Sequence, residues 1–143
     1  MKRAPLIFAA VIGCAVFPAV VRAQIIIVNS ANKQTELTKD QISDIFLKKS
    51  RKWDNGKTIV PVDQTKPVKT RETFSKTYHG RSVSAIESFW QQQIFSGKDV
   101  PPAVKDNDAD VVAFVKANPN AIGYVSANAT LGDGVKVVTV RGL

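Results

Sequence analysis

The chain has 143 residues, which is enough for one ordinary domain and too few for two. Lys and Arg outnumber Asp and Glu by 20 to 12, so the formal net charge is +8, and 44% of the residues are hydrophobic. This balance is typical of a globular domain and excludes a disordered chain. The single Cys excludes a disulfide framework, and the single His excludes a metal site built from several histidines. We therefore expect neither a metal site nor a cofactor.

The first 23 residues have the order of a secretory signal peptide. A short positive head, Met1-Lys2-Arg3, precedes an almost uncharged apolar run that ends at Val21. Small residues then stand three places and one place before Gln24, which is the pattern that signal peptidase cleaves. We expect cleavage after Ala23 and export to the periplasm.

Two other interpretations of this segment stay open. The apolar run approaches the length of a membrane anchor, and the sequence Val-Ile-Gly-Cys that ends at Cys14 resembles a lipoprotein cleavage box. Removal of residues 1–23 takes away three cations and the Cys, so the remaining domain, residues 24–143, has a formal charge of +5 and no thiol. Such a domain needs no disulfide chemistry in an oxidising compartment, and we expect no membrane insertion after cleavage.

The first predicted elements after the signal are a strand and a helix. Residues 24–29 contain a continuous β-branched run, which predicts a strand buried on both faces. Thr38 and Gln41 have the spacing of a capping box, so a helix is expected to begin at Thr38. The apolar face of this helix has members three and four residues apart, namely Ile42, Ile45 and Phe46.

A second strand and a second helix follow. The apolar stretch 58–62 predicts the strand, and the polar residues 63–69 are expected to form a connection. Phe74 and Tyr78 lie four residues apart on the next predicted helix, which Gly80 ends.

Two more helices are expected in the second half of the chain. Ser84 and Glu87 have capping-box spacing at the start of a helix that stops near Gly97. The apolar residues of that helix share one face, namely Ile86, Phe89, Trp90 and Ile94. Asn107 and Asp110 have the residue types and spacing to cap the next helix.

Two strands, over residues 121–125 and 135–140, complete the predicted elements. Strands that alternate with helices of this length are typical of an α/β domain with a largely parallel sheet. We therefore predict one α/β domain over residues 24–143, with a mostly parallel central sheet of four to five strands flanked by four helices.

No catalytic constellation stands out, so no enzyme activity is expected. His79 is the only imidazole and lies at a predicted helix end, where a cation interacts favourably with the helix dipole. The serines lie in no nucleophile elbow, and Asp106, Asp108 and Asp110 lack the glycine that a calcium loop needs. Nucleic-acid binding is not expected, because the basic residues are dispersed and the aromatic residues of the helices lie on apolar faces.

Basic and hydroxyl side chains cluster where the second predicted strand gives way to a helix. The cluster consists of Thr65, Lys66, Lys69, Thr70 and Arg71. A helix N-terminus offers free backbone N–H groups to an anion, and open α/β sheets bind ligands at their carboxyl edge. These residues are our candidate anion-binding site, and a solvated basic helix start is the simpler alternative.

Several segments, in order, resemble the second lobe of the phosphate-binding proteins of ABC transporters. They are Leu37 to Leu47, Ile59 to Val62, Thr70 to Phe74, and Pro119 to Val125, which contains a motif very similar to the family's Gly-Ala-Ile-Gly-Tyr-Val. The segment around Trp90, Ile94 to Gly97 and Pro101-Pro102 is similar to a short, exported, single-lobe branch of that family. Together the matches extend over essentially all of residues 24–140.

The resemblance implies a single lobe of a type II periplasmic binding protein with a solute-binding role in transport. It implies a small oxyanion such as phosphate as the ligand, and an ABC permease or a second copy of the chain as partners. An interaction module, whose former cleft face contacts another protein or its own copy, is the alternative function, and a small hydrolase is a third.

The expected anion site departs from that of the larger relatives. In those relatives the loop before Thr70 carries an arginine and a Gly-Ser-Gly-Thr cradle, whereas here Gln64 and the sequence Pro67-Val68-Lys69-Thr70 take these places. The bidentate guanidinium that suits phosphate is therefore absent from this position. Thr70, one lysine and the helix end would contribute about 4–6 kcal/mol before the loss of translational freedom, so we expect millimolar or weaker phosphate affinity.

Overall fold

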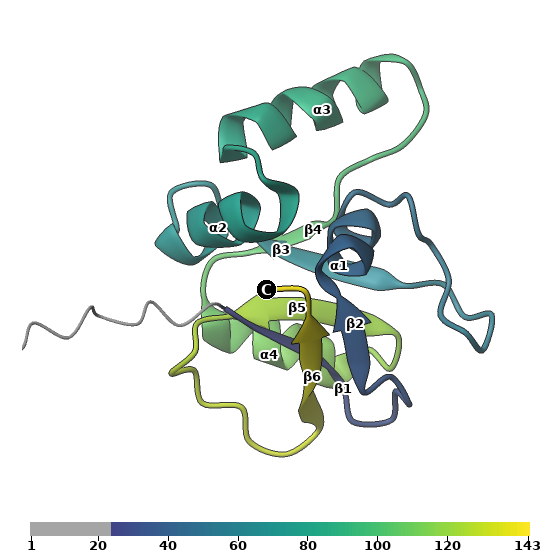
Figure 1. Cartoon of the computed structure of the whole chain (residues 1–143), viewed down its shortest axis with the longest axis vertical. Helices are drawn as coiled ribbons and strands as arrows, with labels where there is room; N and C mark the ends of the chain where they lie inside the picture. The colour runs from purple at the N-terminus through teal and green to yellow at the C-terminus, as the bar shows by residue number, and fades with distance from the viewer. Residues whose placement is uncertain (1–23) are drawn as a thin grey trace, which may run out of the picture.

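The structure is a computed structural model that describes residues 24–143, so the predicted signal peptide lies outside the described residues. The described residues form one six-stranded sheet with helices on both faces (Figure 1). The strands are β1 (Ile25–Asn29), β2 (Glu36–Thr38), β3 (Val60–Gln64), β4 (Ala103–Lys105), β5 (Ala121–Val125) and β6 (Val135–Arg141). The helices are α1 (Lys39–Phe46), α2 (Lys69–Phe74), its π-helical continuation η1 (Ser75–His79), α3 (Val83–Phe95) and α4 (Asp108–Ala117). None of these helices has the length and hydrophobicity needed to cross a membrane.

The strands are arranged in the order β2-β6-β1-β5-β3-β4. β3 runs parallel to both β4 and β5, and β2 runs parallel to β6, whereas β1 runs antiparallel to both of its neighbours. The predicted α/β lobe is confirmed, with two strands at the edges that the sequence did not indicate. These two strands, β2 and β4, have three residues each, which is too short for a periodic pattern to be recognised.

Alternate side chains of β1 point to opposite faces of the sheet and help to build two separate cores. On one face, Ile27 and Val62 pack with Val111 and Val115 of α4. Gly123 of β5 allows this helix to approach closely, because a Cβ atom there would lie 2.7 Å from Cγ1 of Val111. The motif that contains Gly123 resembles that of the family, and its glycine also allows α4 to pack closely on the sheet.

The other face carries an aromatic core between the sheet, α1 and the helix formed by α2 and η1. The rings of Phe74 and Tyr124 stack with their centroids 3.8 Å apart, and Phe46 meets Phe74 edge-on at 4.8 Å. Tyr78 lies beside Phe74, with centroids 4.7 Å apart, so the predicted four-residue pair is confirmed as a buried contact. Such aromatic pairs contribute about 0.5–1.5 kcal/mol each beyond the area that they bury.

The predicted starts of α1 and α4 are confirmed. The backbone N–H of Gln41 donates to Thr38 Oγ1 at 3.1 Å, and the N–H of Thr38 donates to Gln41 Oε1 at 2.8 Å, which completes a capping box. At α4, the N–H of Asp110 donates to the side chain of Asn107 at 2.8 Å. Each cap satisfies a backbone donor that the helix itself leaves free.

The start of α3 differs from the prediction. Ser82, not Ser84, caps this helix, because the N–H of Ala85 donates to Ser82 Oγ at 3.2 Å. Glu87, which a capping box at Ser84 would need, pairs instead with Lys66, with 2.9 Å between Oε2 and Nζ. Ser82 and Ser84 both suit a cap by residue type, so the local sequence does not distinguish them. The contact of Glu87 with Lys66, which is distant in the sequence, does distinguish them.

Figure 1 shows α3 at the top of the view, away from the sheet, and this helix packs against η1. Its N-terminal half is anchored by buried Val83, Ile86 and Trp90. The C-terminal end is not covered, since the side chains of Ile94 and Phe95 are 53% and 95% exposed. The apolar face that the sequence predicts on this helix is therefore only partly buried.

β3 ends two residues later than the sequence predicts. The predicted strand covers residues 58–62, whereas β3 covers Val60–Gln64. Asp63 and Gln64, which the prediction assigned to a polar connection, are both buried in the strand. This shift places their side chains at the carboxyl edge of the sheet, directly before the predicted anion site.

Candidate anion-binding site

The carboxyl ends of three neighbouring strands meet at one edge of the sheet. β5, β3 and β4 run parallel, so the chain leaves Val125, Gln64 and Lys105 at this same edge. The turn into α2 follows β3, the start of α4 follows β4, and Ser126 follows β5. All five predicted site residues lie on the turn or in the first residues of α2. This is the edge where open α/β folds bind ligands.

Four of the five predicted residues lie on or near the surface of the edge. Lys66 and Lys69 are exposed, and Thr65 and Thr70 are half-buried. The ammonium group of Lys66 lies 2.9 Å from the carboxylate of Glu87 in α3, whereas Lys69 forms no ion pair with another described residue. The turn therefore presents two lysines and two threonines, with one of the lysines already paired.

Arg71, the fifth predicted residue, is directed into the protein. Its side chain is buried, its Nη1 donates to the backbone carbonyl of Gln64 at 2.7 Å, and the same nitrogen lies 3.5 Å from Asp63 Oδ2. The guanidinium therefore fastens α2 to the end of β3. An anion on the surface of the turn would not meet this group directly.

Asp63 accepts hydrogen bonds from inside the fold. Its Oδ1 accepts the hydroxyl of Tyr124 and the backbone N–H of Gln64, the latter at 2.9 Å. Burial raises the pKa of the Asp63 carboxyl above its ordinary value, while Arg71 and the two hydrogen bonds act in the opposite direction. Burial and the neighbouring charge of Asp63 also raise the pKa of the Tyr124 hydroxyl, so Tyr124 remains a hydrogen-bond donor.

Gln64 is fully buried at the end of β3. Its Nε2 donates to the carbonyl of Tyr124 and to Oδ1 of Asp108, both at 3.0 Å. Its Oε1 has no hydrogen-bond partner among residues 24–143. The side chain is therefore held in place by the contacts that it donates.

Asp108, the first residue of α4, connects the ends of β3 and β5. In addition to Gln64, it accepts the N–H of Ser126 at 3.2 Å and the Ser126 hydroxyl. The sequence pattern placed Asp108 only in a spacing that lacks the glycine of a calcium loop and gave no role to Ser126, so both contacts were missed. The signal that was available is topological, because parallel strands bring the residues that follow them to one edge.

His79 is not the cation that its place at a helix end predicts. Burial, together with the positive charges of Arg71, Arg81 and Lys49, lowers its pKa to about 4. The ring is therefore neutral at neutral pH, and its Nδ1 lies 2.7 Å from Ser43 Oγ. An imidazole with this pKa is a poor general base near neutral pH.

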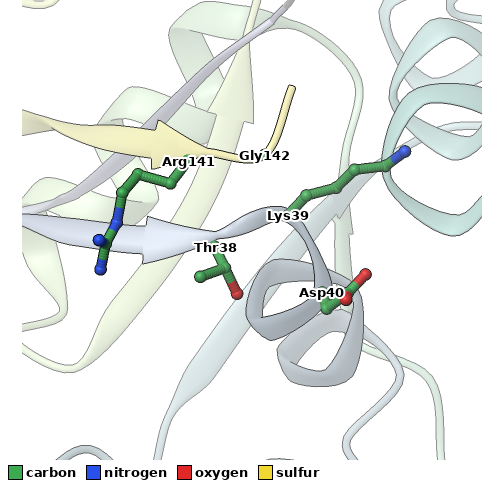
Figure 2. A pocket seen from close by; sticks show the side chains of 5 residues that line it. All are labelled: Thr38, Lys39, Asp40, Arg141 and Gly142. Atoms are coloured by element: carbon green, nitrogen blue, oxygen red, sulfur yellow. The ribbon is translucent and has the colours of Figure 1, made fainter.

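A hollow of about 560 Å³ lies at the same carboxyl edge but on the other side of the sheet, where β2 leads into α1. Its lining residues are Thr38, Lys39, Asp40, Arg141 and Gly142. Figure 2 shows the side chains of Lys39 and Arg141 pointing away from each other, so they do not converge on one ligand. Elsewhere in residues 24–143, no group of three or more His, Cys, Asp or Glu side chains is placed to hold a metal ion.

The sheet and the helices that cover it have the fold of a lobe of the PBP superfamily. The sequence matches the PBP superfamily domain over residues 9–142, and the chain belongs to this superfamily. The expected relationship to phosphate ABC transporter binding proteins is thereby confirmed at the level of the family. No curated protein matches the sequence.

Two solved structures have a similar fold. One is a protein assigned to the phosphate ABC transporter substrate-binding proteins, with bound phosphate, from Clostridium perfringens; it is 26% identical over 85% of this chain and 46% of its own length, with a TM-score of 0.68. The other is an ABC-type phosphate transport receptor from Vibrio cholerae, 20% identical over 85% of this chain and 47% of its own length, with a TM-score of 0.67. The chain thus spans a little under half the length of each of these proteins.

Proposed function

We propose that this chain is an exported solute-binding protein that binds a small oxyanion such as phosphate at the turn into α2. The observation that carries the proposal is the likeness to the Clostridium perfringens protein with bound phosphate. The proposed ligand contacts are Thr65, Lys66, Lys69 and Thr70, with Arg71 positioning the turn from inside. An ABC permease is the proposed partner that receives the solute in the periplasm.

The contacts at the turn support weak binding. Gln64 provides no guanidinium, and Lys66 is shared with Glu87. A hydrogen bond to a charged group contributes roughly 1.5–3 kcal/mol, and part of that gain is lost to the restriction of the ligand. Two or three such contacts on an open surface correspond to a millimolar dissociation constant, which needs only about 4 kcal/mol.

The test is a thermal-shift screen of the mature protein against phosphate, sulfate, molybdate and organic anions, followed by calorimetry. We expect phosphate to raise the melting temperature only at millimolar concentration. Low-micromolar affinity of a verified monomer would contradict the weak site, and the absence of any effect from all the anions would contradict oxyanion binding.

Export is tested on the protein recovered from cells. We expect the periplasmic fraction to contain a chain that begins at Gln24, as determined by mass spectrometry of the intact protein. A chain lipidated at Cys14, or one that keeps residues 1–23 in the membrane fraction, would contradict cleavage after Ala23.

We assign no enzymatic role to the chain. Among residues 24–143, the close pair of Ser43 and His79 most resembles a nucleophile and base, and the low pKa of His79 argues against general-base function. Generic ester and phosphoester substrates should therefore be hydrolysed only at background rates.

A dimerising module is the second candidate function. Ile94 and Phe95 are 53% and 95% exposed at the end of α3, and adjacent exposed apolar side chains are typical of interaction surfaces. If a second copy covers them, light scattering will report a dimer, and Phe95→Ser will shift it to the monomer. A wild-type monomer at high concentration would remove this candidate.

A further inference from the structure

Three uncharged donor groups converge on the Asp108 carboxylate at the carboxyl edge. Gln64 Nε2 lies 3.0 Å from Oδ1, the N–H of Ser126 donates to the same oxygen at 3.2 Å, and the Ser126 hydroxyl donates to Oδ2. No Lys or Arg among residues 24–143 forms an ion pair with Asp108. Backbone and side-chain donors gathered in this way also bind external oxyanions in proteins.

Gln64 is held by contacts that do not involve Asp108, and Ser126 is attached to a buried strand. Gln64 is fully buried, its Nε2 also donates to the Tyr124 carbonyl at 3.0 Å, and its backbone carbonyl accepts Arg71. Ser126 directly follows β5, in which every residue is buried. Gln64 therefore belongs to the sheet and Ser126 directly follows it, whereas the carboxylate is supplied by a different element, the first residue of α4.

We propose that the Asp108 carboxylate is a built-in occupant of an anion cradle formed by Gln64 and Ser126. The residue at position 108 then determines whether this part of the edge accepts an external anion. The matching ligand is a small carboxylate such as formate, because it reproduces the group that Asp108 supplies. In the native chain the cradle is filled, so a solute would meet only the turn into α2. The inference concerns the chain without solute and does not depend on oxyanion binding at that turn.

The test is to remove the Asp108 carboxylate by substitution and to supply a carboxylate as free formate. Asp108→Ala leaves the three donors without their acceptor, so the melting temperature should fall by roughly 3–6 °C for each kcal/mol of hydrogen bonding that is lost. Formate at tens of millimolar should restore at least half of that shift, whereas chloride at equal ionic strength should not. In the variant, formate should also move the NMR signal of the Ser126 amide, a signal that should stay in place in the wild-type protein.

Asp110→Ala is the matched control. Asp110 lies in the same first turn of α4 and carries the same charge toward the helix dipole, but its side chain contacts Asn107 and not the cradle. Its substitution should lower the melting temperature without any recovery in formate. Equal recovery of the two variants would show a general salt effect and would overturn the proposal.

Other results for the Asp108→Ala variant and the wild-type protein would also support or overturn the proposal. An Asp108→Ala protein that does not fold in chloride should refold in formate, and failure to refold in either salt would contradict a preformed cradle. An unchanged melting temperature in the variant would show that the donors do not need the carboxylate. Movement of the Ser126 amide signal when formate is added to the wild-type protein would show that Asp108 does not fill the cradle.

Discussion

The carboxyl edge of the sheet has an outer layer and an inner layer, which use charged groups differently. In the outer layer, the turn into α2, Lys66 and Lys69 reach solvent. In the inner layer, Asp63 and Arg71 lie next to each other, and Asp108 accepts three protein donors. The comparison indicates that inner charges hold strand and helix ends together, while outer charges remain available to a solute. Substitutions in the inner layer should therefore change stability, and those in the outer layer should change binding.

The largest expected effect is that of Arg71→Ala. This change leaves the Asp63 carboxylate buried without its cation and frees the Gln64 carbonyl, so we expect the free energy of unfolding to fall by about 3–5 kcal/mol. Urea denaturation measures the loss. Lys76→Ala, which removes an exposed ion pair with Glu72 on the same helical segment, should cost less than about 1 kcal/mol. Equal losses of unfolding free energy for the two variants would show that the buried Arg71 contributes no more to stability than an exposed cation.

An intermediate effect is expected from His79, which lies beside the inner layer. Its pKa is lowered from 6.5 to about 4 in the folded chain, so between these pH values the unfolded chain binds the additional proton. The contribution of His79 to stability is therefore complete above pH 6.5 and is lost as the pH falls toward 4. The loss is at most about 1.4 kcal/mol for each pH unit. Urea denaturation at a series of pH values measures this slope.

His79→Gln isolates this contribution from that of the carboxylates. The variant has no imidazole to titrate, so its stability should depend less on pH between 6.5 and 4 than that of the wild-type protein. Parallel curves for the two proteins would show that the pKa of His79 is not lowered by folding.

The smallest expected effects belong to the outer layer. Lys69→Ala should weaken phosphate binding by roughly threefold to tenfold, as the loss of up to one charged contact implies, and should change stability by less than about 0.5 kcal/mol. Glu87→Gln should strengthen binding, because it releases Lys66 from its ion pair. Lys57→Ala is the control, since Lys57 is an exposed cation that lies outside the turn. Equal weakening by Lys57→Ala would show a general charge effect.

The sequence predicted those parts of the fold that depend on residues close together in the chain. The β-branched run of β1, the Thr38–Gln41 capping box and the Asn107 cap depend on residues that are neighbours in the chain, and all three are present. The short strands β2 and β4 exist because they pair with β6 and β3, and no pattern within three residues indicates such a pairing. The predicted capping box of Ser84 and Glu87 is wrong for a similar reason, because Glu87 pairs with Lys66, which is distant in the sequence.

The inner layer of the site was not predictable from local pattern. Asp63 and Gln64 are polar, which favours a loop, and they are buried because Tyr124 and Asp108 approach from distant parts of the chain. The burial of Arg71 has the same origin, since its partners lie at the end of β3. The two lysines of the outer layer could be proposed from sequence because their place in the turn after a strand and their exposure follow from local sequence.

The most direct test of the two-layer account is an NMR titration of the mature protein with inorganic phosphate. We expect the amide signals of Thr65, Lys66 and residues 68–70 to move with a millimolar dissociation constant, while the signal of Ser126 stays in place. Movement centred on Ser126, or on the hollow around Thr38 and Arg141 in place of the turn, would contradict the account.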